Sequence, residues 1–290
     1  MFLSIRDCMV AGDEFASPVE GLRHLGVEAA EIALDGSFHV LELNTRNRLR
    51  LESDADVDAY RDHLGALGVR ASCLLTEEDA GERGDYVDWM TRAVEVAERL
   101  ETPCLRVDPV MKRAGEMSFD ERVMALANPL KEVIRRTPKS RVSFGLENHG
   151  VFGNNLAFLL NVFQEVGSDR VGMTVDTGNF YWRGYPLTEV YGILKILAPY
   201  AKHTHVKNIN YPLETREKQR EAGWEYGTYM APLDEGDIDH RVVADILKKA
   251  GYRGDFCIED ESLEKFEAGA DRRAVLERDV LHVRAVLENA

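Results

Sequence analysis

The chain of 290 residues is long enough to form one large barrel or two domains of average size, with a substantial buried core. Its 36 basic and 51 acidic side chains give a formal net charge of −15, which argues against nucleic acid as a partner, because phosphate binding relies on clustered Lys and Arg. Residues 1–8 are too short and too charged for a signal peptide, and no window approaches the ~20 apolar residues of a spanning helix. We therefore expect a cytoplasmic protein without a membrane partner.

A glycine closes several helical stretches shortly before a strand, and this arrangement recurs along the chain. Gly26 follows a short helix over 18–25, and Gly68, Gly167 and Gly251 occupy the same place in later units. A glycine just past a helix readily takes the left-handed conformation that ends it. The repetition predicts alternating β/α units, with strands near residues 2–8, 27–34, 69–75, 104–109, 142–148, 171–177, 202–207 and 255–260.

Eight such strands, each followed by a helix, predict an α/β fold, a single (β/α)8 TIM barrel that spans residues 1–290 as one domain. Helical spacing of apolar residues supports this, and Ser118 and Glu121 form a capping box at the start of one helix. The competing architecture is an open doubly wound sheet, which usually carries a glycine-rich phosphate loop after its first strand. Residues 6–10 contain no such loop, so the barrel is favoured.

The four cysteines lie in or beside apolar runs, and none belongs to a CxxC pair. We expect them to be core cysteines of a reducing compartment, in preference to disulfides or a thiolate metal site. The residues concerned are Cys8, Cys73, Cys104 and Cys257.

Four of the predicted strands change from alternating apolar residues to polar ones at their carboxyl ends. The run over 142–150 ends around Glu147, and later runs end around Asp176, His205 and Glu259. Because side chains alternate along a strand, these four point inward if the apolar residues between them pack on helices. The carboxyl ends of barrel strands are where the active sites of such folds lie, so we expect the four to meet there.

Three carboxylates and one imidazole in a barrel mouth repel one another and titrate abnormally unless a cation lies among them. Oxygen-rich ligation with one His suits Mn²⁺ or Mg²⁺ better than a structural zinc site. We predict Mn²⁺, with Mg²⁺, Co²⁺ or Zn²⁺ as alternatives. The competing explanation is that Arg6, Arg106 or Lys207 neutralises each carboxylate separately.

A metal in this position predicts a reaction. A cation that binds the carbonyl and adjacent hydroxyl of a sugar acidifies the carbon-bound proton beside the carbonyl, so a carboxylate can remove it and form an enediolate. Glu147 and Glu259 lie on different strands and approach such a substrate from different sides. One takes the proton and the other returns it.

Other side chains near the strand tips are predicted to bind the substrate. For the histidine and the aromatic residues among them, a structural hydrogen bond or simple packing is the competing role. Two long connections, 35–54 and 209–237, lie at the same end, and connections of this length are usually functional or disordered. The predicted substrate-binding residues are His149, Lys207, Arg106, Trp182 and Trp224.

The strand tips resemble the metal-site motifs of the sugar phosphate isomerase/epimerase, or xylose isomerase-like, TIM-barrel superfamily. The resemblance rests on the order of elements along the whole chain and on four short motifs, Gly-Leu-Glu-Asn over 145–148, Val-Asp-Thr-Gly-Asn over 175–179, His-Thr-His-Val-Lys over 203–207 and Ile-Glu-Asp over 258–260. It implies a metal held by Glu147, Asp176, His205 and Glu259, with the two glutamates as acid and base. It also implies a small carbohydrate substrate, and leaves a homo-oligomer open.

Three branches of that superfamily are compared with this chain, and the comparison argues against the DNA-repair branch. Its ketose epimerases carry a substrate-gripping Glu and His at the positions that hold Gly153 and Tyr181 here. Its apurinic endonucleases need a cluster of histidines, but Asn179 occupies one of those positions. We predict a sugar isomerase or epimerase, with a lyase acting on an inosose or 3-keto-sugar as the runner-up and a non-catalytic carbohydrate-binding relative as the third reading.

Overall fold

The computed structural model describes residues 1–289, and within them eight parallel strands form one barrel sheet. The pairing order is β12-β1-β2-β5-β6-β7-β8-β9. The last gap closes through a parallel bridge between Val206 and Ile258, where the Val206 amide donates to the Cys257 carbonyl at 2.7 Å. The strands are β1 (Phe2–Arg6), β2 (Ala29–Ala33), β5 (Arg70–Leu75), β6 (Cys104–Val107), β7 (Ser143–Glu147), β8 (Val171–Asp176), β9 (Ala201–His205) and β12 (Asp255–Ile258).

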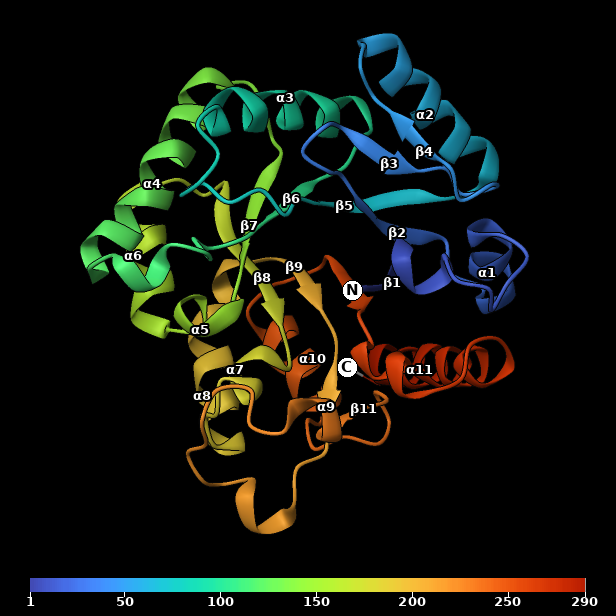
Figure 1. Cartoon of the computed structure of the whole chain (residues 1–290), viewed down its shortest axis with the longest axis vertical. Helices are drawn as coiled ribbons and strands as arrows, with labels where there is room; N and C mark the ends of the chain where they lie inside the picture. The colour runs from blue at the N-terminus through green and yellow to red at the C-terminus, as the bar shows by residue number, and fades with distance from the viewer. Residues whose placement is uncertain (290) are drawn as a thin grey trace.

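Each barrel strand is followed by a helix of eight or more residues, which confirms the predicted (β/α)8 TIM barrel over the part of the chain that the structure describes. Figure 1 shows these helices around the central strands, with α4 and α6 on one side and α1 and α11 on the other. The helices are α1 (Pro18–Leu25), α2 (Asp54–Leu67), α3 (Tyr86–Arg99), α4 (Phe119–Arg136), α6 (Leu156–Val166), α8 (Leu187–Leu197), α10 (His240–Lys249) and α11 (Ala270–Glu288).

Shorter elements lie in the connections, most of them at the end of the barrel where the strands finish. Two small hairpins and three single-turn helices lie in the connections of the described chain: β3 (His39–Leu41) with β4 (Arg48–Arg50), β10 (Asn208–Ile209) with β11 (Met230–Ala231), α5 (Gly150–Gly153), α7 (Asn179–Trp182) and α9 (Tyr226–Tyr229). Turns of 3₁₀ helix occupy Asp7–Val10, Ala114–Glu116, Ala198–Tyr200, Leu213–Thr215 and Glu261–Lys265.

Local signals read from the sequence are reproduced at the helix ends. Ser118 and Glu121 form the expected capping box of α4, with both reciprocal hydrogen bonds present. Gly26, Gly68 and Gly167 adopt left-handed φ values of 65°, 73° and 63° where α1, α2 and α6 end. These caps fix where each helix turns back toward the next strand.

Gly65 inside α2 and Gly68 just after it allow two contributions to stability to be measured separately: the left-handed cap and the helix interior. A Cβ on either Gly65 or Gly68 meets nothing within 4 Å, so crowding does not enter the comparison. We expect Gly68→Ala to lower the free energy of unfolding by about 1 kcal/mol, because an alanine resists the left-handed conformation. Gly65→Ala should raise it by about 0.5–1 kcal/mol, because alanine favours the helix. Urea unfolding measures both, and equal effects of the same sign would contradict the assignment.

The barrel packs its apolar side chains outward, against the helices. Phe144, Met173 and Phe256 are fully buried there, together with helical residues such as Leu126 and Leu276. The inward-facing side chains are unusually polar for a barrel of this kind. Buried polar and thiol side chains on the barrel strands include Ser4, Glu31, Ser72, Cys73, Thr174, His203, Asp255 and Cys257.

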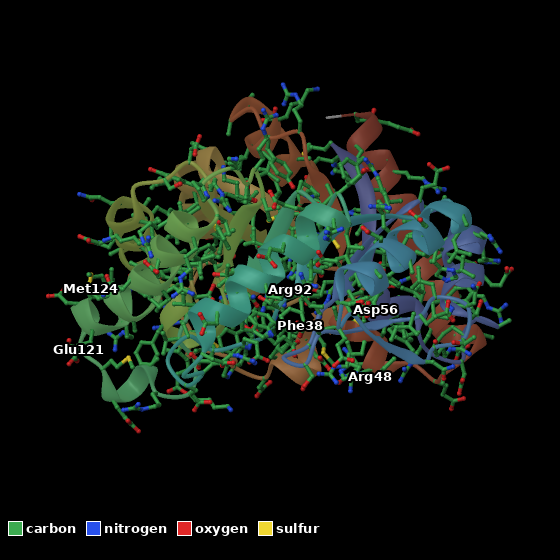
Figure 2. All side chains as sticks on the ribbon, turned by 90° about the horizontal axis from the view of Figure 1, so that it is seen from above. Phe38, Arg48, Asp56, Arg92, Glu121 and Met124 are labelled. Atoms are coloured by element: carbon green, nitrogen blue, oxygen red, sulfur yellow. The ribbon has the colours of Figure 1, made fainter. Side chains whose placement is uncertain are left out.

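Both long connections make specific side-chain contacts with the rest of the barrel. Figure 2 labels Phe38 and Arg48 of the first connection. The Phe38 ring, just before β3, lies 5.4 Å from that of Trp89 on α3, and Arg48 on β4 forms an ion pair with Asp35. In the second, Arg220 packs its guanidinium against the rings of Tyr181 and Tyr211 and donates to backbone carbonyls, as described further below.

The prediction of buried, unpaired cysteines is confirmed for three of the four and wrong for one. All four are free, and Cys73, Cys104 and Cys257 are buried as expected. Cys8 is exposed, so the prediction of a core cysteine was wrong there. The cause is that β1 ends at Arg6 and the chain turns into 3₁₀ helix, which carries Cys8 out of the strand pattern.

Between residues 1 and 289, no helix combines the length and the apolar character needed to cross a bilayer.

Candidate metal centre

Four side chains converge at the carboxyl end of the barrel. Glu147 ends β7, Asp176 ends β8, His205 ends β9, and Glu259 follows β12. One ligand atom from each lies within 4.8 Å of the others, and all four side chains are buried. Parallel strands bring their carboxyl ends to the same rim, which is why residues separated by more than a hundred positions meet here.

Three atoms of this cluster are buried without a hydrogen bond from any residue between 1 and 289: Asp176 Oδ2, His205 Nδ1 and Glu259 Oε2. Leaving such atoms unsatisfied is costly in a protein interior. Nδ1 of His205 lies 3.4 Å from Glu147 Oε2 and 3.3 Å from Glu259 Oε2. A donor set of three carboxylates and one imidazole, with unsatisfied atoms facing one another, fits a divalent cation.

Basic side chains approach the same carboxylates, as the competing explanation expected. Arg6 pairs with Glu259, and Arg106 pairs with Glu147. Nζ of Lys207 lies 3.0 Å from Asp176 Oδ2. These residues therefore neutralise part of the negative charge of the cluster. Among residues 1–289, Nδ1 of His205 is left with only the two long contacts to Glu147 and Glu259, between which a cation would fit.

The electrostatics divide the cluster into two ionised and two protonated groups. Burial alone would raise the pKa of both glutamates, but His205, Lys207 and Arg6 lower that of Glu259 to about 2. Arg106 and His205 hold the pKa of Glu147 well below its usual range in the same way. Both carboxylates are consequently ionised at neutral pH, as a proton acceptor requires.

The pKa values of the other two groups, Asp176 and His205, are raised. Burial, reinforced by Glu259 and Glu147, raises the pKa of Asp176 to about 8 against the effect of Lys207. Burial lowers the pKa of His205, but the surrounding carboxylates outweigh it and raise the value to about 10. Both groups hold protons at neutral pH that a bound metal must displace.

Residues 19–284 match the family model described as xylose isomerase-like TIM barrel. The chain belongs to this family. An inosose dehydratase from Klebsiella pneumoniae subsp. pneumoniae is 25% identical over 157 residues, which cover 53% of this chain and 52% of that protein. The match thus spans about half the length of this curated relative.

Solved structures share the fold over nearly the whole chain. A structure of the IOLI protein with a zinc atom superposes with a TM-score of 0.72 at 15% identity, covering 99% of this chain and 98% of that one. A structure of L-ribulose 3-epimerase gives a TM-score of 0.67 at 15% identity, covering 99% of this chain and 95% of that one. At these identities the similarity shows the fold alone.

Arg106 and His149 flank Glu147 in this member of the xylose isomerase-like family. Arg106 pairs with Asp108 at 2.7 Å, and Nδ1 of His149 lies 2.7 Å from Asp108 Oδ1. Asn179 donates to Glu147 Oε1 at 3.0 Å. Arg106 is fully engaged by these partners, whereas His149 stays partly exposed at the rim. Substrate binding by either stays a prediction.

Lys207 lies between the candidate centre and the 3₁₀ turn Glu261–Lys265. Besides Asp176, its ammonium contacts Glu259 Oε2 at 3.4 Å and Glu261. Tyr226 of α9 donates to the other oxygen of Glu261 at 2.6 Å. This chain of contacts ties the 209–237 connection to the cluster, and a substrate contact by Lys207 stays a prediction.

The two predicted tryptophans lie in packed surroundings. The Trp224 ring stacks on that of Tyr229 with centroids 5.5 Å apart and tilts against Tyr211. Trp182 lies beside Gly223, where an added Cβ would come within 3.3 Å of its Nε1. Packing therefore accounts for both rings in this family member, and their contact with a ligand stays a prediction.

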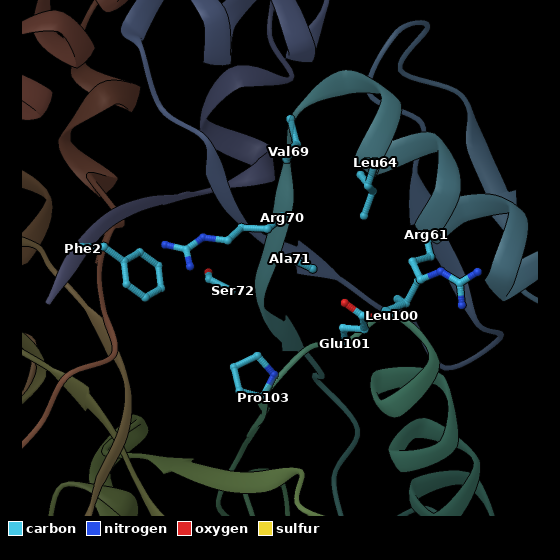
Figure 3. Close-up of a pocket in the computed structure, with 11 residues that line it drawn as sticks. Phe2, Arg61, Leu64, Val69, Arg70, Ala71, Ser72, Leu100, Glu101 and Pro103 are labelled. Atoms are coloured by element: carbon cyan, nitrogen blue, oxygen red, sulfur yellow. The ribbon is translucent and has the colours of Figure 1, made fainter.

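Cavities occur at both ends of the barrel. One of about 230 Å³ lies at the carboxyl ends of β1 and β2, bordered by Cys8, Asp35 and Arg48. Another of about 440 Å³ lies at the opposite end, where Phe2 and Arg70 begin their strands (Figure 3). The candidate centre of this xylose isomerase-like barrel is at the first end, so the larger cavity is remote from it.

Proposed function

We propose that this chain is a divalent-metal-dependent isomerase or epimerase that removes the proton beside the carbonyl of a sugar or keto-sugar. The observation that carries the proposal is the placement of Glu147 and Glu259 at 3.4 Å and 3.3 Å from the same His205 nitrogen. The two glutamates come from opposite sides of the pair β8 and β9. A carboxylate on each side of a substrate allows one to accept the proton and the other to return it.

The proposed ligands are Glu147, Asp176, His205 and Glu259. A divalent cation bound there would polarise the substrate carbonyl and acidify the neighbouring carbon-bound proton. The unsatisfied buried atoms of the cluster and the zinc atom of the IOLI protein support a metal. Mn²⁺ as the preferred ion remains our prediction from the oxygen-rich ligand set.

Dehydration of an inosose or 3-keto-sugar is the second candidate, and the inosose dehydratase that matches half of the chain favours it. Both reactions begin with removal of the same proton. An isomerase or epimerase reprotonates the enediolate, whereas a dehydratase expels a β-hydroxyl from it. A carbohydrate-binding protein without turnover is the third candidate, which the pair of ionised glutamates disfavours.

Deuterium exchange tests the proposal. Protein stripped of metal and protein reloaded with Mn²⁺ or Mg²⁺ are incubated in D₂O with a panel of ketoses, keto-inositols and 3-keto-sugars. The small molecules are then separated and examined by NMR and mass spectrometry. We expect the metal-loaded protein alone to introduce deuterium beside the carbonyl of at least one compound.

The products distinguish the candidates. An exchanged compound of unchanged composition supports isomerisation or epimerisation, and a product lacking one water supports the dehydratase. Metal-dependent binding of a panel compound without any exchange would overturn the catalytic proposal in favour of the binding protein.

A further inference from the structure

Glu31 is a buried carboxylate that sequence reasoning missed, and it lies behind the candidate metal centre. It occupies the middle of β2, where the sequence reads Ala-Ala-Glu-Ile-Ala, and its side chain is 1% exposed. Nε2 of His205 lies 3.0 Å from each of its two oxygens. Nε2 of His203 lies 2.8 Å from one of them.

The chemistry of these contacts fixes where the protons are. An ionised carboxylate only accepts hydrogen bonds, and the two oxygens of Glu31 face the Nε2 atoms of His205 and His203 at distances of 2.8–3.0 Å. Both Nε2 atoms therefore donate to Glu31. When the His205 ring is neutral its Nδ1 carries the lone pair, and that atom faces Glu147 and Glu259.

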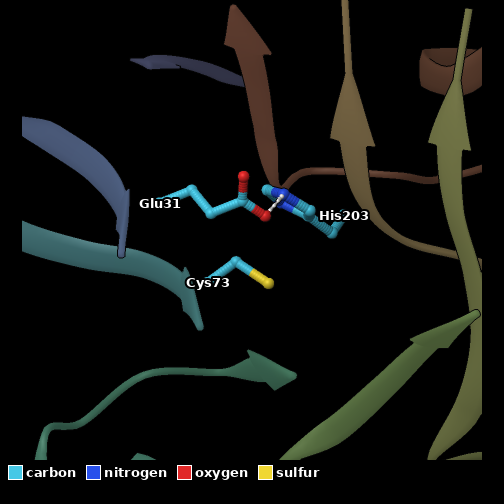
Figure 4. Close-up of side chains that lie close together, drawn as sticks. All are labelled: Glu31, Cys73 and His203. Atoms are coloured by element: carbon cyan, nitrogen blue, oxygen red, sulfur yellow. Dashed lines mark hydrogen bonds and ion pairs between the residues drawn. The ribbon is translucent and has the colours of Figure 1, made fainter. Parts of the chain in front are cut away.

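Glu31 is itself held in place from the other side. The second nitrogen of His203 lies 2.9 Å from Asp255 Oδ1, and Asp255 accepts a further hydrogen bond from Ser4 at 2.7 Å. Figure 4 shows Glu31 directed at His203, with the Cys73 thiol below the pair. Glu31, Cys73 and His203 are close enough to bind a metal of their own. Both nitrogens of His203 are already hydrogen-bonded, however, so we interpret the group as support for His205.

We propose that Glu31 is a positioning residue, which holds the His205 imidazole with Nε2–H toward the barrel interior and Nδ1 toward the metal. This inference rests on the proposed function for the metal itself. Carboxylate–histidine pairs of this kind orient a ligand ring and fix which nitrogen binds. Arg6 adds to the rigidity, because its Nε lies 3.3 Å from Glu31 while its other end contacts Glu259.

The variant Glu31→Gln tests the role without a change of size. A glutamine has one acceptor oxygen and one NH₂ donor. If its oxygen accepts from both histidines, its NH₂ group points at the Nε2–H of His205, and two donors face each other. We expect its dissociation constant for Zn²⁺ or Mg²⁺, measured by isothermal titration calorimetry, to rise by about 10- to 100-fold. Cys73→Ser is the matched control, because Cys73 is equally buried beside the pair but hydrogen-bonds to the Leu74 carbonyl. Its metal affinity should stay within about twofold of wild type.

A second measurement uses the wild-type protein and does not depend on the variant folding. Long-range ¹H–¹⁵N NMR of the Zn²⁺-loaded protein should show His205 protonated at Nε2 and metal-bound at Nδ1. Coordination through Nε2, or an unchanged metal affinity in a folded Glu31→Gln variant, overturns the role of Glu31. A wild-type protein that binds no divalent metal overturns the metal centre and this role together. Neither measurement requires turnover, so a failure to find a substrate would affect the proposed reaction alone.

Discussion

Replacing Glu147 or Glu259 with glutamine is expected to lower the metal-dependent rate of product formation by about 10²- to 10⁴-fold, the usual contribution of a positioned acid or base. Glutamine preserves the size of the side chain but neither takes up nor releases a proton at the substrate. The assay is the D₂O incubation described above, run at metal concentrations that calorimetry shows to be saturating for each variant. When each variant is saturated with metal, a lower rate reports a loss of chemistry and not a loss of metal binding.

The two variants should differ in a way that assigns their roles. The residue that removes the proton is needed for both deuterium exchange and product formation. The residue that returns it from the other side is needed for product formation, so its variant should still exchange. Glu261→Gln is the control, because Glu261 contacts Lys207 and Tyr226 and does not belong to the cluster. Product formation within about tenfold of wild type in both glutamine variants would contradict the acid/base assignment.

Metal affinity is expected to rise steeply with pH, by up to about 100-fold between about pH 6 and 7. His205, with a pKa of about 10, and Asp176, with a pKa of about 8, are both protonated in the metal-free protein at these pH values. Both must lose their protons to act as ligands, so metal binding releases about two protons, and each contributes a tenfold gain per pH unit. The slope should fall toward one proton above about pH 8, where Asp176 is already ionised.

Calorimetry in buffers of different ionisation enthalpy counts these protons directly. Ca²⁺-free, chelator-treated protein is titrated with Mg²⁺ or Mn²⁺ at each pH, and the apparent heat is plotted against the buffer's heat of ionisation. An affinity independent of pH, with no proton released, would show that His205 and Asp176 are not both ligands.

The convergence of the four candidate ligands was predictable because it follows from simple rules. A period of two along each strand decides which side chains face inward, and parallel strands in a barrel place their carboxyl ends on one rim. Glu147, Asp176 and Glu259 each stand at the end of an apolar run, and His205 ends a predicted strand, so the sequence marks all four. Their roles as ligands, like the division of the chain into domains and its cytoplasmic location, stay predictions.

Glu31 was not predictable in the same way. It lies inside a strand, and the pairing of β2 with β5 shifts register between Ala30 and Glu31, which disturbs the simple alternation. Its partners His203 and His205 are more than 170 positions away. A charged residue within an otherwise apolar strand was the available signal, but it does not say which partner neutralises the charge. The same limit applies to Cys8, whose exposure depends on where β1 ends.

The contacts of Arg220 with Tyr181, Tyr185 and Tyr211 bear on how fast a ligand binds. Its guanidinium lies 4.5 Å and 4.3 Å from the ring centroids of Tyr181 and Tyr211, and it donates to the carbonyls of Tyr181 and Tyr185 at 3.1 Å. These contacts tie the 209–237 connection to α7 and the residues just after it, so we expect ligand association to cost little chain entropy in that segment. Encounter with a small ligand should then proceed in a single concentration-dependent phase, without a slow ordering step after contact.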